Sequence, residues 1–120
     1  MKKLDVVVAY ICSIILIQTL FFKFTGAAES IWIFQTLGVE PWGRYASGVM
    51  ELIAAIALIF SPTRVYGALL VAGIMGGAIL SHLAVLGIEV QNDGGLLFML
   101  ALICFSSASF IIYFRRKEFL

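Results

Sequence analysis

Charged residues are the scarcest class in this 120-residue sequence, at 12% of the chain, against roughly 25% in ordinary soluble domains. Hydrophobic residues make up 62%, and the mean hydropathy is +1.09. This composition excludes a soluble globular domain, because too few polar side chains would remain to cover its surface. The eight basic residues form no stripe along the chain, which excludes a nucleic-acid-binding surface.

Cysteine and histidine are also nearly missing. Cys12 and Cys104 lie inside apolar runs, 92 positions apart, without the Cys-x-x-Cys spacing of a disulfide relay. We interpret both as buried thiols that pack as small hydrophobic side chains. His82 is the one histidine, and neither a carboxylate pair nor a thiolate pair accompanies it, so the sequence predicts no metal site. No residue is assigned a catalytic role.

The sequence contains four long runs with little or no charge. Three runs contain no Lys, Arg, Asp or Glu: residues 6–22, 65–88 and 94–114. A fourth, between Arg44 and Arg64, contains only Glu51. The first run has 17 residues, more than the roughly 7 to 15 of a signal-peptide core, so we interpret it as a span. A membrane-crossing helix needs roughly 20 apolar residues.

The sequence therefore predicts an all-α integral membrane four-helix bundle, with residues 1–120 forming a single domain. The spans are expected at about residues 5–24, 43–60, 64–87 and 94–114. Only the first connection is long, and its segment 29–37 is predicted to be a short interfacial helix in the first extracytoplasmic loop, beside Trp32 and Trp42. On the third span, small residues recur every four positions, which is typical of close helix packing within a bundle.

Basic residues are distributed unevenly between the two predicted faces of the membrane. Four spans place both termini on one side. That side carries six basic residues: Lys2, Lys3, Arg64, Arg115, Arg116 and Lys117. The other side carries two, Lys23 and Arg44. Cytoplasmic loops are enriched in Lys and Arg, so we expect a multi-pass protein of the cell (inner or plasma) membrane with both termini cytoplasmic.

Ionisable side chains gather in the predicted outer half of the bilayer. Arg44 and Glu51 are seven residues apart and share one helical face, with Gly48 between them. His82 lies at a matching depth on the third span, and Lys23 ends the first. An ionisable group inside a span is costly and marks a candidate site. The candidate ligand and proton pocket comprises Lys23, Arg44, Glu51 and His82, with Gln18, Gly48 and Asp93 nearby.

Three expectations follow for this pocket. Arg44 and Glu51 should be energetically coupled as a buried pair, Glu51 and His82 should be able to share a proton, and the inner half of the bundle should hold nothing comparable. A structural alternative stays open, in which Arg44 and Glu51 only neutralise each other and hold two helices in register.

The chain also carries motifs that resemble those of the DoxX family of four-helix membrane proteins: Phe22-Lys23-x-x-Gly26, Arg44-x-x-x-Gly48-x-x-Glu51-Leu52, Arg64-x-x-Gly67 and Ala78-x-x-x-His82. The resemblance covers nearly the whole chain. It implies a connection to quinol oxidation or thiosulfate:quinone chemistry, a role as membrane partner of a redox enzyme, and a polar pocket at Lys23, Arg44, Glu51 and His82.

The leading hypothesis is a DoxX-like membrane protein that binds a quinone or similar amphiphile and serves a redox partner. Glu51 and His82 would handle protons, while Arg44 and Lys23 would hold the polar head. Two alternatives come from other classes: a small proton-coupled exporter, and a structural or assembly subunit. The expected partners are the lipid bilayer, a redox enzyme and a second copy of the chain. Quinone or quinol is the candidate cofactor, and catalytic activity stays open because the chain has no intrinsic redox motif.

Overall fold

The computed structural model describes residues 4–26, 28–88 and 94–115. Five α-helices run through these residues: α1 (Leu4–Thr25), α2 (Ala28–Thr36), α3 (Trp42–Ile59), α4 (Arg64–Ser81) and α5 (Leu96–Phe114). A 3-10 turn, η1 (Ser61–Thr63), joins α3 to α4, and a π-helical turn, η2 (His82–Leu86), extends α4. The described ranges contain no β-strand.

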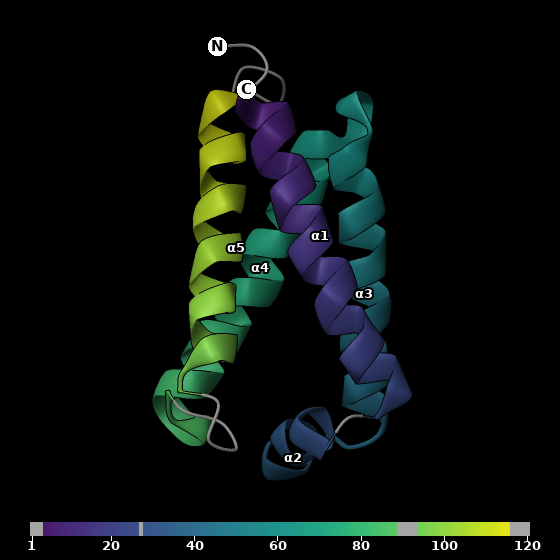
Figure 1. Ribbon diagram of the computed structural model, residues 1–120, viewed down its shortest axis with the longest axis vertical. Coiled ribbons are helices and arrows are strands. Elements are labelled where there is room, and N and C mark those ends of the chain that lie inside the picture. The colour runs from purple at the N-terminus through teal and green to yellow at the C-terminus, as the bar shows by residue number, and fades with distance from the viewer. Residues whose placement is uncertain (1–3, 27, 89–93, 116–120) are drawn as a thin grey trace.

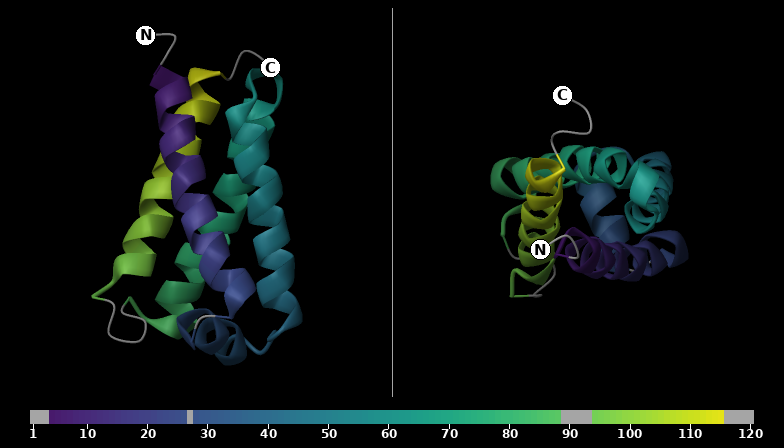
Figure 2. Two further views of the ribbon diagram at one scale, coloured as in Figure 1. Left: turned by 45° about the vertical axis from the view of Figure 1, so that its right-hand side comes forward. Right: turned by 90° about the horizontal axis from the view of Figure 1, so that it is seen from above.

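The four long helices form a closed ring. α1 packs on α3, α3 on α4, α4 on α5, and α5 returns to α1. The short helix α2 lies across one end of this ring, where it contacts α1, α3 and η2 (Figures 1 and 2). We call this end the α2 end, and the opposite end, where α1 begins and α5 stops, the terminal end. The longest dimension is 40 Å, close to the roughly 40 to 45 Å of a bilayer with its head groups.

The outer surface of the ring is apolar. Within the described residues, α1, α3, α4 with its flanking turns, and α5 are long and apolar enough to cross a membrane. Their largest outward-facing side chains include Ile14, Phe21, Leu80 and Tyr113, which would be costly to expose to water but suit contact with lipid. The predicted all-α membrane bundle is confirmed.

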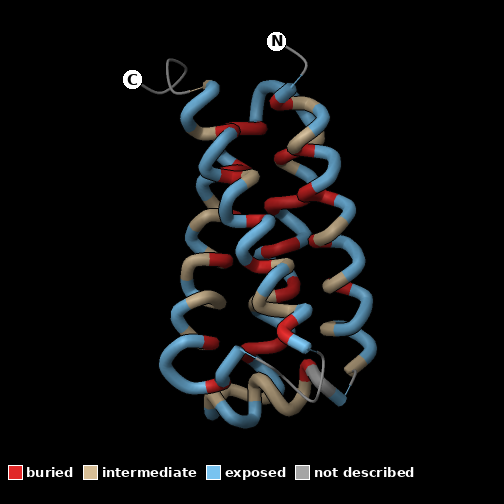
Figure 3. Tube along the Cα trace, turned by 60° about the vertical axis from the view of Figure 1, so that its left-hand side comes forward, coloured by how far each residue is buried: buried red, intermediate tan, exposed pale blue. Residues whose placement is uncertain are grey.

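The core fills the terminal half of the bundle more completely than the α2 half (Figure 3). On α5 the buried residues begin only at Ala101, so its first turn, from Leu96 to Leu100, is not buried. On α4 the last buried residue is Met75, and the next along the chain is His82 in η2. Tight packing therefore holds the helices together at one end and leaves space between them at the other.

Two arginines stabilise the ends of neighbouring helices. Arg64, in the first turn of α4, donates through Nε to the Leu58 carbonyl at 2.7 Å and through Nη2 to the Ile59 carbonyl at 2.8 Å, at the end of α3. Arg44, in the first turn of α3, donates in the same way to the Lys23 carbonyl near the end of α1. The last carbonyls of a helix have no partner within it, and lipid offers none. Each arginine therefore supplies donors that the bilayer lacks.

The terminal end contains a charged cluster that the sequence did not reveal. Asp5 and Arg64 are both buried, with 3.7 Å between Oδ2 and Nη1, and Arg115 Nε lies 3.6 Å from the same carboxylate oxygen. Arg115 also donates to the backbone and side-chain oxygens of Ser61, each at 3.0 Å. The expectation that the inner half holds nothing comparable is wrong. The tight η1 turn brings Arg64 back beneath α3, where the first turn of α1 supplies Asp5.

Glycines on α4 differ in what surrounds them. A Cβ on Gly67 would lie 2.8 Å from the Leu58 nitrogen and 3.0 Å from the Ala54 carbonyl oxygen, so the glycine lets the backbones of α3 and α4 meet. Gly76 faces Phe105 of α5. Gly73 and Gly77 are exposed, and a Cβ added to either would meet no atom within 4 Å, so the expected packing role within the bundle does not extend to them.

Gly67→Ala should therefore destabilise the protein, because the added methyl group would clash with the α3 backbone, which cannot change rotamer as a side chain can. Overpacking of this kind costs roughly 1 to 3 kcal/mol. Gly73→Ala is the matched control on the same helix, and alanine's higher helix propensity should leave its stability unchanged or raise it by up to about 1 kcal/mol. Thermal unfolding in detergent, followed by circular dichroism, measures both. Equal midpoints for the two variants would refute the close contact at Gly67.

Candidate functional site

A buried ion pair links α1 to α3 near the α2 end. Glu51 of α3 is 2% exposed, and its Oε2 lies 2.7 Å from Nζ of Lys23, which stands in the last turn of α1. Lys23 also donates to Ser47 Oγ at 2.9 Å, and its ammonium lies 5.7 Å from the centroid of the Phe34 ring. A lone carboxylate is costly in a low-dielectric interior, and a nearby cation with good hydrogen-bond geometry offsets that cost. Lys23 thus allows Glu51 to be buried.

Arg44 has a different partner from the one expected. Its Nη2 lies 2.9 Å from Oε1 of Glu40, one helical turn away, and its Nε donates to the same carboxylate. Although Arg44 and Glu51 share a helical face, two turns separate them by roughly 10 Å along the axis. The predicted direct pairing of Arg44 with Glu51 is therefore wrong. Their connection is indirect, because Arg44 binds the backbone carbonyl of Lys23, whose ammonium binds Glu51.

A cavity of about 500 Å³ lies between the helices toward the α2 end. Volumes of roughly 300 to 1,000 Å³ are typical of small-molecule sites. Apolar side chains from α1, α2, α4 and α5 form most of its wall, among them Ile15, Phe34, Met75 and Leu100. The polar residues of the wall are fewer: Gln18, Thr19, Lys23, Ser30, Ser47, Glu51, Ser81 and His82. Such a cavity suits a ligand that is largely apolar and carries a few polar atoms.

α1 and α5 diverge toward the α2 end (Figures 1 and 2), and both helices contribute residues to the cavity wall. Its wall includes exposed residues from both helices, namely Gln18 and Phe22 of α1 and Leu96 of α5. Residues of α2 and the turn after it border the cavity from the α2 end: Ser30, Ile33, Phe34 and Leu37. The wall between α1 and α5 is thus the part that faces lipid.

His82 is held at the junction of α4 and η2. Its Nδ1 lies 2.9 Å from the Gly87 carbonyl oxygen, and its ring stacks edge-on against Phe98, with 5.5 Å between centroids. A carbonyl oxygen can only accept, so Nδ1 carries the hydrogen, and Nε2 of the neutral ring is left as an acceptor. Irregular π turns often occur at functional sites. Here the turn holds an imidazole on the cavity wall.

One carboxylate oxygen of Glu51 also remains available. Lys23 binds Oε2, while Oε1 makes no hydrogen bond to any residue in the described ranges. No fully buried side-chain nitrogen or oxygen among these residues is left without a partner. Since Glu51 lines the cavity, Oε1 opens onto it. The cavity therefore presents a carboxylate oxygen and an imidazole nitrogen that are both free to receive a proton or a hydrogen bond.

The sequence-predicted site residues fall into three groups. Gln18, Lys23, Glu51 and His82 line the cavity together. Arg44 and Gly48 do not: Arg44 stabilises the end of α1, and a Cβ on Gly48 would lie 2.9 Å from the Phe24 ring of α1. Asp93 lies outside the described residues.

Sequence reasoning missed other residues of the cavity wall. Ser47 is one turn before Glu51, and this spacing was a usable signal. The α2 residues and Cys104 gave no such signal, because only the folded chain brings them to the cavity.

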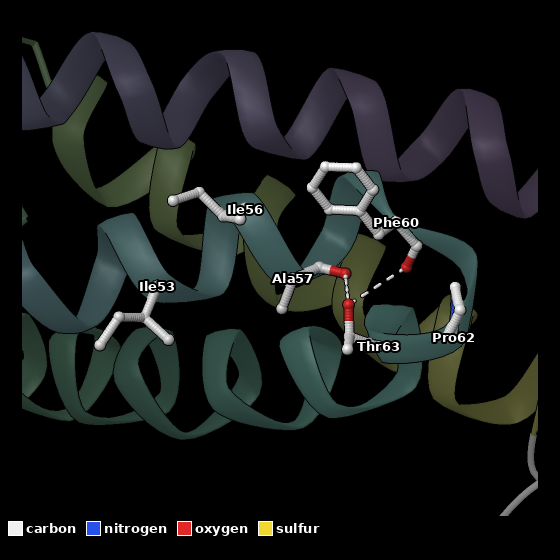
Figure 4. A pocket seen from close by; sticks show the side chains of 6 residues that line it. All are labelled: Ile53, Ile56, Ala57, Phe60, Pro62 and Thr63. Carbon is white, nitrogen blue, oxygen red and sulfur yellow. Dashed lines mark hydrogen bonds between the residues drawn. The ribbon is translucent and has the colours of Figure 1, made fainter.

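A second hollow, of about 420 Å³, lies at the terminal end of α3 (Figure 4). It is lined by Ile53, Ile56, Ala57, Phe60, Pro62 and Thr63. The Thr63 hydroxyl donates to the carbonyls of Ala57 and Phe60, so the one side-chain polar group here is already satisfied. The residues that line the hollow include no ionisable group, and its largely apolar wall suggests no specific chemistry.

Residues 7–113 match the DoxX-like family. The chain belongs to this family. It is a multi-pass membrane protein, as the four apolar helices of the described bundle also indicate. No curated protein and no solved structure is similar enough to match. The motif positions that carried the resemblance now have structural roles in this DoxX-like protein: Arg44, Gly48 and Glu51 all contact α1.

Lys23 and Glu51 should be energetically coupled. Removing one partner of a fully buried pair costs roughly 3 to 5 kcal/mol, and because Lys23 keeps 16% exposure the loss should fall at or below that range. Lys23→Met and Glu51→Gln should each lower stability, and the double variant should lose less than their sum. Unfolding in detergent measures the cycle. Asp5→Asn combined with Glu51→Gln is the control, with additive losses expected. Additive losses for Lys23 and Glu51 too would contradict the ion pair.

Proposed function

We propose that this DoxX-like protein binds a quinone or a similarly built amphiphile in the cavity at the α2 end, and that it serves a redox partner in the membrane. The observation that carries the proposal is the composition of the cavity wall. Lys23, Glu51 and His82 supply a donor and two acceptors within a wall that is otherwise largely apolar. A quinone head has an apolar ring with carbonyl oxygens that accept hydrogen bonds, and its quinol form donates them. Both forms find a partner here.

The route of entry is consistent with a lipid-soluble ligand. The divergence of α1 and α5 puts exposed residues of both helices on the cavity wall, so the site is bordered by lipid rather than enclosed by protein. An amphiphile can place its head beside Glu51 and leave its apolar tail between α1 and α5. α2 limits access from the membrane surface at that end. The arrangement therefore selects ligands that arrive through the bilayer.

Proton exchange at the head is the second part of the proposal. Reduction of a quinone takes up two protons, and oxidation of a quinol releases two. Oε1 of Glu51 and Nε2 of His82 are two proton-accepting atoms on the same cavity wall, each held in place through its other polar atom. The Lys23 ammonium lies 2.7 Å from Oε2 of Glu51 and would stabilise the carboxylate whenever it is not protonated.

Ligand binding should depend on the Glu51 carboxylate beyond its effect on folding. Glu51→Gln leaves Lys23 unpaired, so Lys23→Met/Glu51→Gln is the informative variant because it removes both charges together. We expect this double variant to recover stability relative to Glu51→Gln alone and still bind decylubiquinone at least about tenfold more weakly than the wild type, a loss of about 1.4 kcal/mol. His82→Phe, which removes the acceptor, should weaken binding as well. Ser109→Ala, on the exposed face of α5, is the control.

Equilibrium binding in nanodiscs, with unfolding midpoints recorded for each variant, separates the two effects. Wild-type affinity in a well-folded double variant would refute the role of Glu51 in the pocket and favour a structural subunit.

We also propose that the α2 end faces away from the cytoplasm and that both termini are cytoplasmic, in the inner or plasma membrane. Gln35 of α2 and Thr63 of η1 are both exposed, at opposite ends of the bundle. In a Cys12→Ala/Cys104→Ala background, Gln35→Cys should react with a membrane-impermeant thiol reagent applied to intact cells, and Thr63→Cys should react only after lysis. Labelling of Thr63→Cys alone in intact cells would establish the inverse orientation.

A further inference from the structure

The side of α2 that faces the cavity carries a single side-chain hydroxyl. Ser30, Ile33 and Phe34 follow the three- and four-residue spacing of one helical face, and all three line the cavity. Leu37 continues this face in the turn after the helix. The Phe34 ring lies near the ammonium of Lys23, with 5.7 Å between Nζ and the ring centroid, so this face of α2 is turned toward the ion pair. Oγ of Ser30 is therefore the side-chain polar atom that α2 contributes to the wall.

This hydroxyl makes no hydrogen bond to any residue that the structure describes, although Ser30 is only 9% exposed. Ser13, the other buried hydroxyl in the described ranges, donates to the Ala55 carbonyl at 3.2 Å. Thr36 of α2 donates to the Trp32 carbonyl at 2.7 Å, as helical hydroxyls often do. No fully buried side-chain oxygen among these residues lacks a partner, so Oγ of Ser30 is accessible and opens onto the cavity that it lines.

The proposed ligand needs hydrogen-bond donors on two sides. A quinone carbonyl can only accept, and the two carbonyls of a para-quinone lie on opposite sides of its ring. The free atoms of His82 and Glu51, Nε2 and Oε1, are acceptors and cannot bind either carbonyl while the imidazole is neutral and the carboxylate is ionised. Lys23 can donate to one carbonyl. The other carbonyl then faces away from the ion pair and requires a donor elsewhere on the wall.

Most of the other polar side chains on the wall are unsuited to this second carbonyl. The hydroxyls of Thr19 and Ser81 already donate to backbone carbonyls of their own helices, at 2.8 and 2.9 Å. Ser47 accepts from Lys23, so it serves the same side of the ring as the ion pair. Gln18 is exposed on α1, where the tail of the ligand is proposed to lie. Ser30 remains as a buried hydroxyl, on a different element from the ion pair, with a hydrogen to donate.

We propose that Ser30 is the second head-group contact of the site and that it selects ligands whose ring carries two oxygens on opposite sides. The inference rests on the proposed function, which supplies the ligand. The hydroxyl donates to the quinone carbonyl that faces away from Lys23, and it rotates to accept from the corresponding hydroxyl of the quinol. The contact thus persists in both oxidation states without transfer of a proton to serine. α2 is the element that recognises the head group, while Glu51 and His82 exchange its protons.

Two probes that differ in their ring oxygens test this assignment by equilibrium binding in nanodiscs. Decylubiquinone has two opposed ring carbonyls, and 4-nonylphenol has one ring hydroxyl. Ser30→Ala should weaken decylubiquinone binding about three- to tenfold, as expected for the loss of one neutral hydrogen bond. It should change nonylphenol binding by less than about twofold, because a phenol donates preferentially to the charged Glu51 carboxylate. Thr36→Ala, on the exposed face of the same helix and outside the cavity wall, is the matched control.

The outcomes separate this proposal from the one on which it rests. If the wild type does not bind decylubiquinone, the proposed function fails and the role of Ser30 fails with it. If the wild type binds and Ser30→Ala binds equally well, the role of Ser30 is overturned and the binding function stands. Equal weakening of both probes in Ser30→Ala would show that the residue supports the docking of α2 rather than the head group, and it would also overturn the assignment. Selective weakening of decylubiquinone supports it.

Discussion

The ion pair between Lys23 and Glu51 is the interaction on which the arrangement of the α2 end depends. A carboxylate within a membrane-spanning helix requires a partner, and the last turn of α1 supplies it at 2.7 Å. This pairing holds α1 beside α3, and the neighbouring residues of α3 serve the same contact. Gly48 makes room for the Phe24 ring, and Arg44 binds the carbonyl of Lys23 itself. Three positions of one motif thus face a single neighbouring helix.

Each end of the bundle contains a buried carboxylate that lies beside a basic side chain, but the two arrangements have different consequences. At the terminal end, the Asp5 carboxylate lies near both Arg64 and Arg115 above a well-filled core, and the helices are held close together. At the α2 end, Lys23 neutralises one oxygen of Glu51 and leaves the other facing a cavity. The first arrangement holds the helices together, and the second leaves a carboxylate oxygen accessible in the cavity between them. A rigid base beneath an open, partly polar cavity is well suited to binding an amphiphile without unfolding the bundle.

The cavity and the ion pair lie next to each other, because Lys23 and Glu51 both line the cavity wall. Cys104 reaches the cavity from α5, Glu51 from α3 and His82 from the end of α4. A ligand there would contact a carboxylate and an imidazole within a wall that is otherwise largely apolar.

The sequence by itself determined the all-α membrane bundle, because an uncharged run of about 20 residues in a bilayer satisfies its backbone hydrogen bonds internally when it forms a helix. It also indicated that Glu51, His82 and Lys23 belong at one end, since depth along a helix follows from residue spacing. The sequence did not indicate which charged side chains would pair with one another. Glu51 pairs with Lys23 rather than Arg44, and Asp5 lies beside Arg64. Only the tertiary structure decided these contacts, because spacing along the chain gives the face and depth of a residue but not which neighbouring helix lies within reach of its side chain.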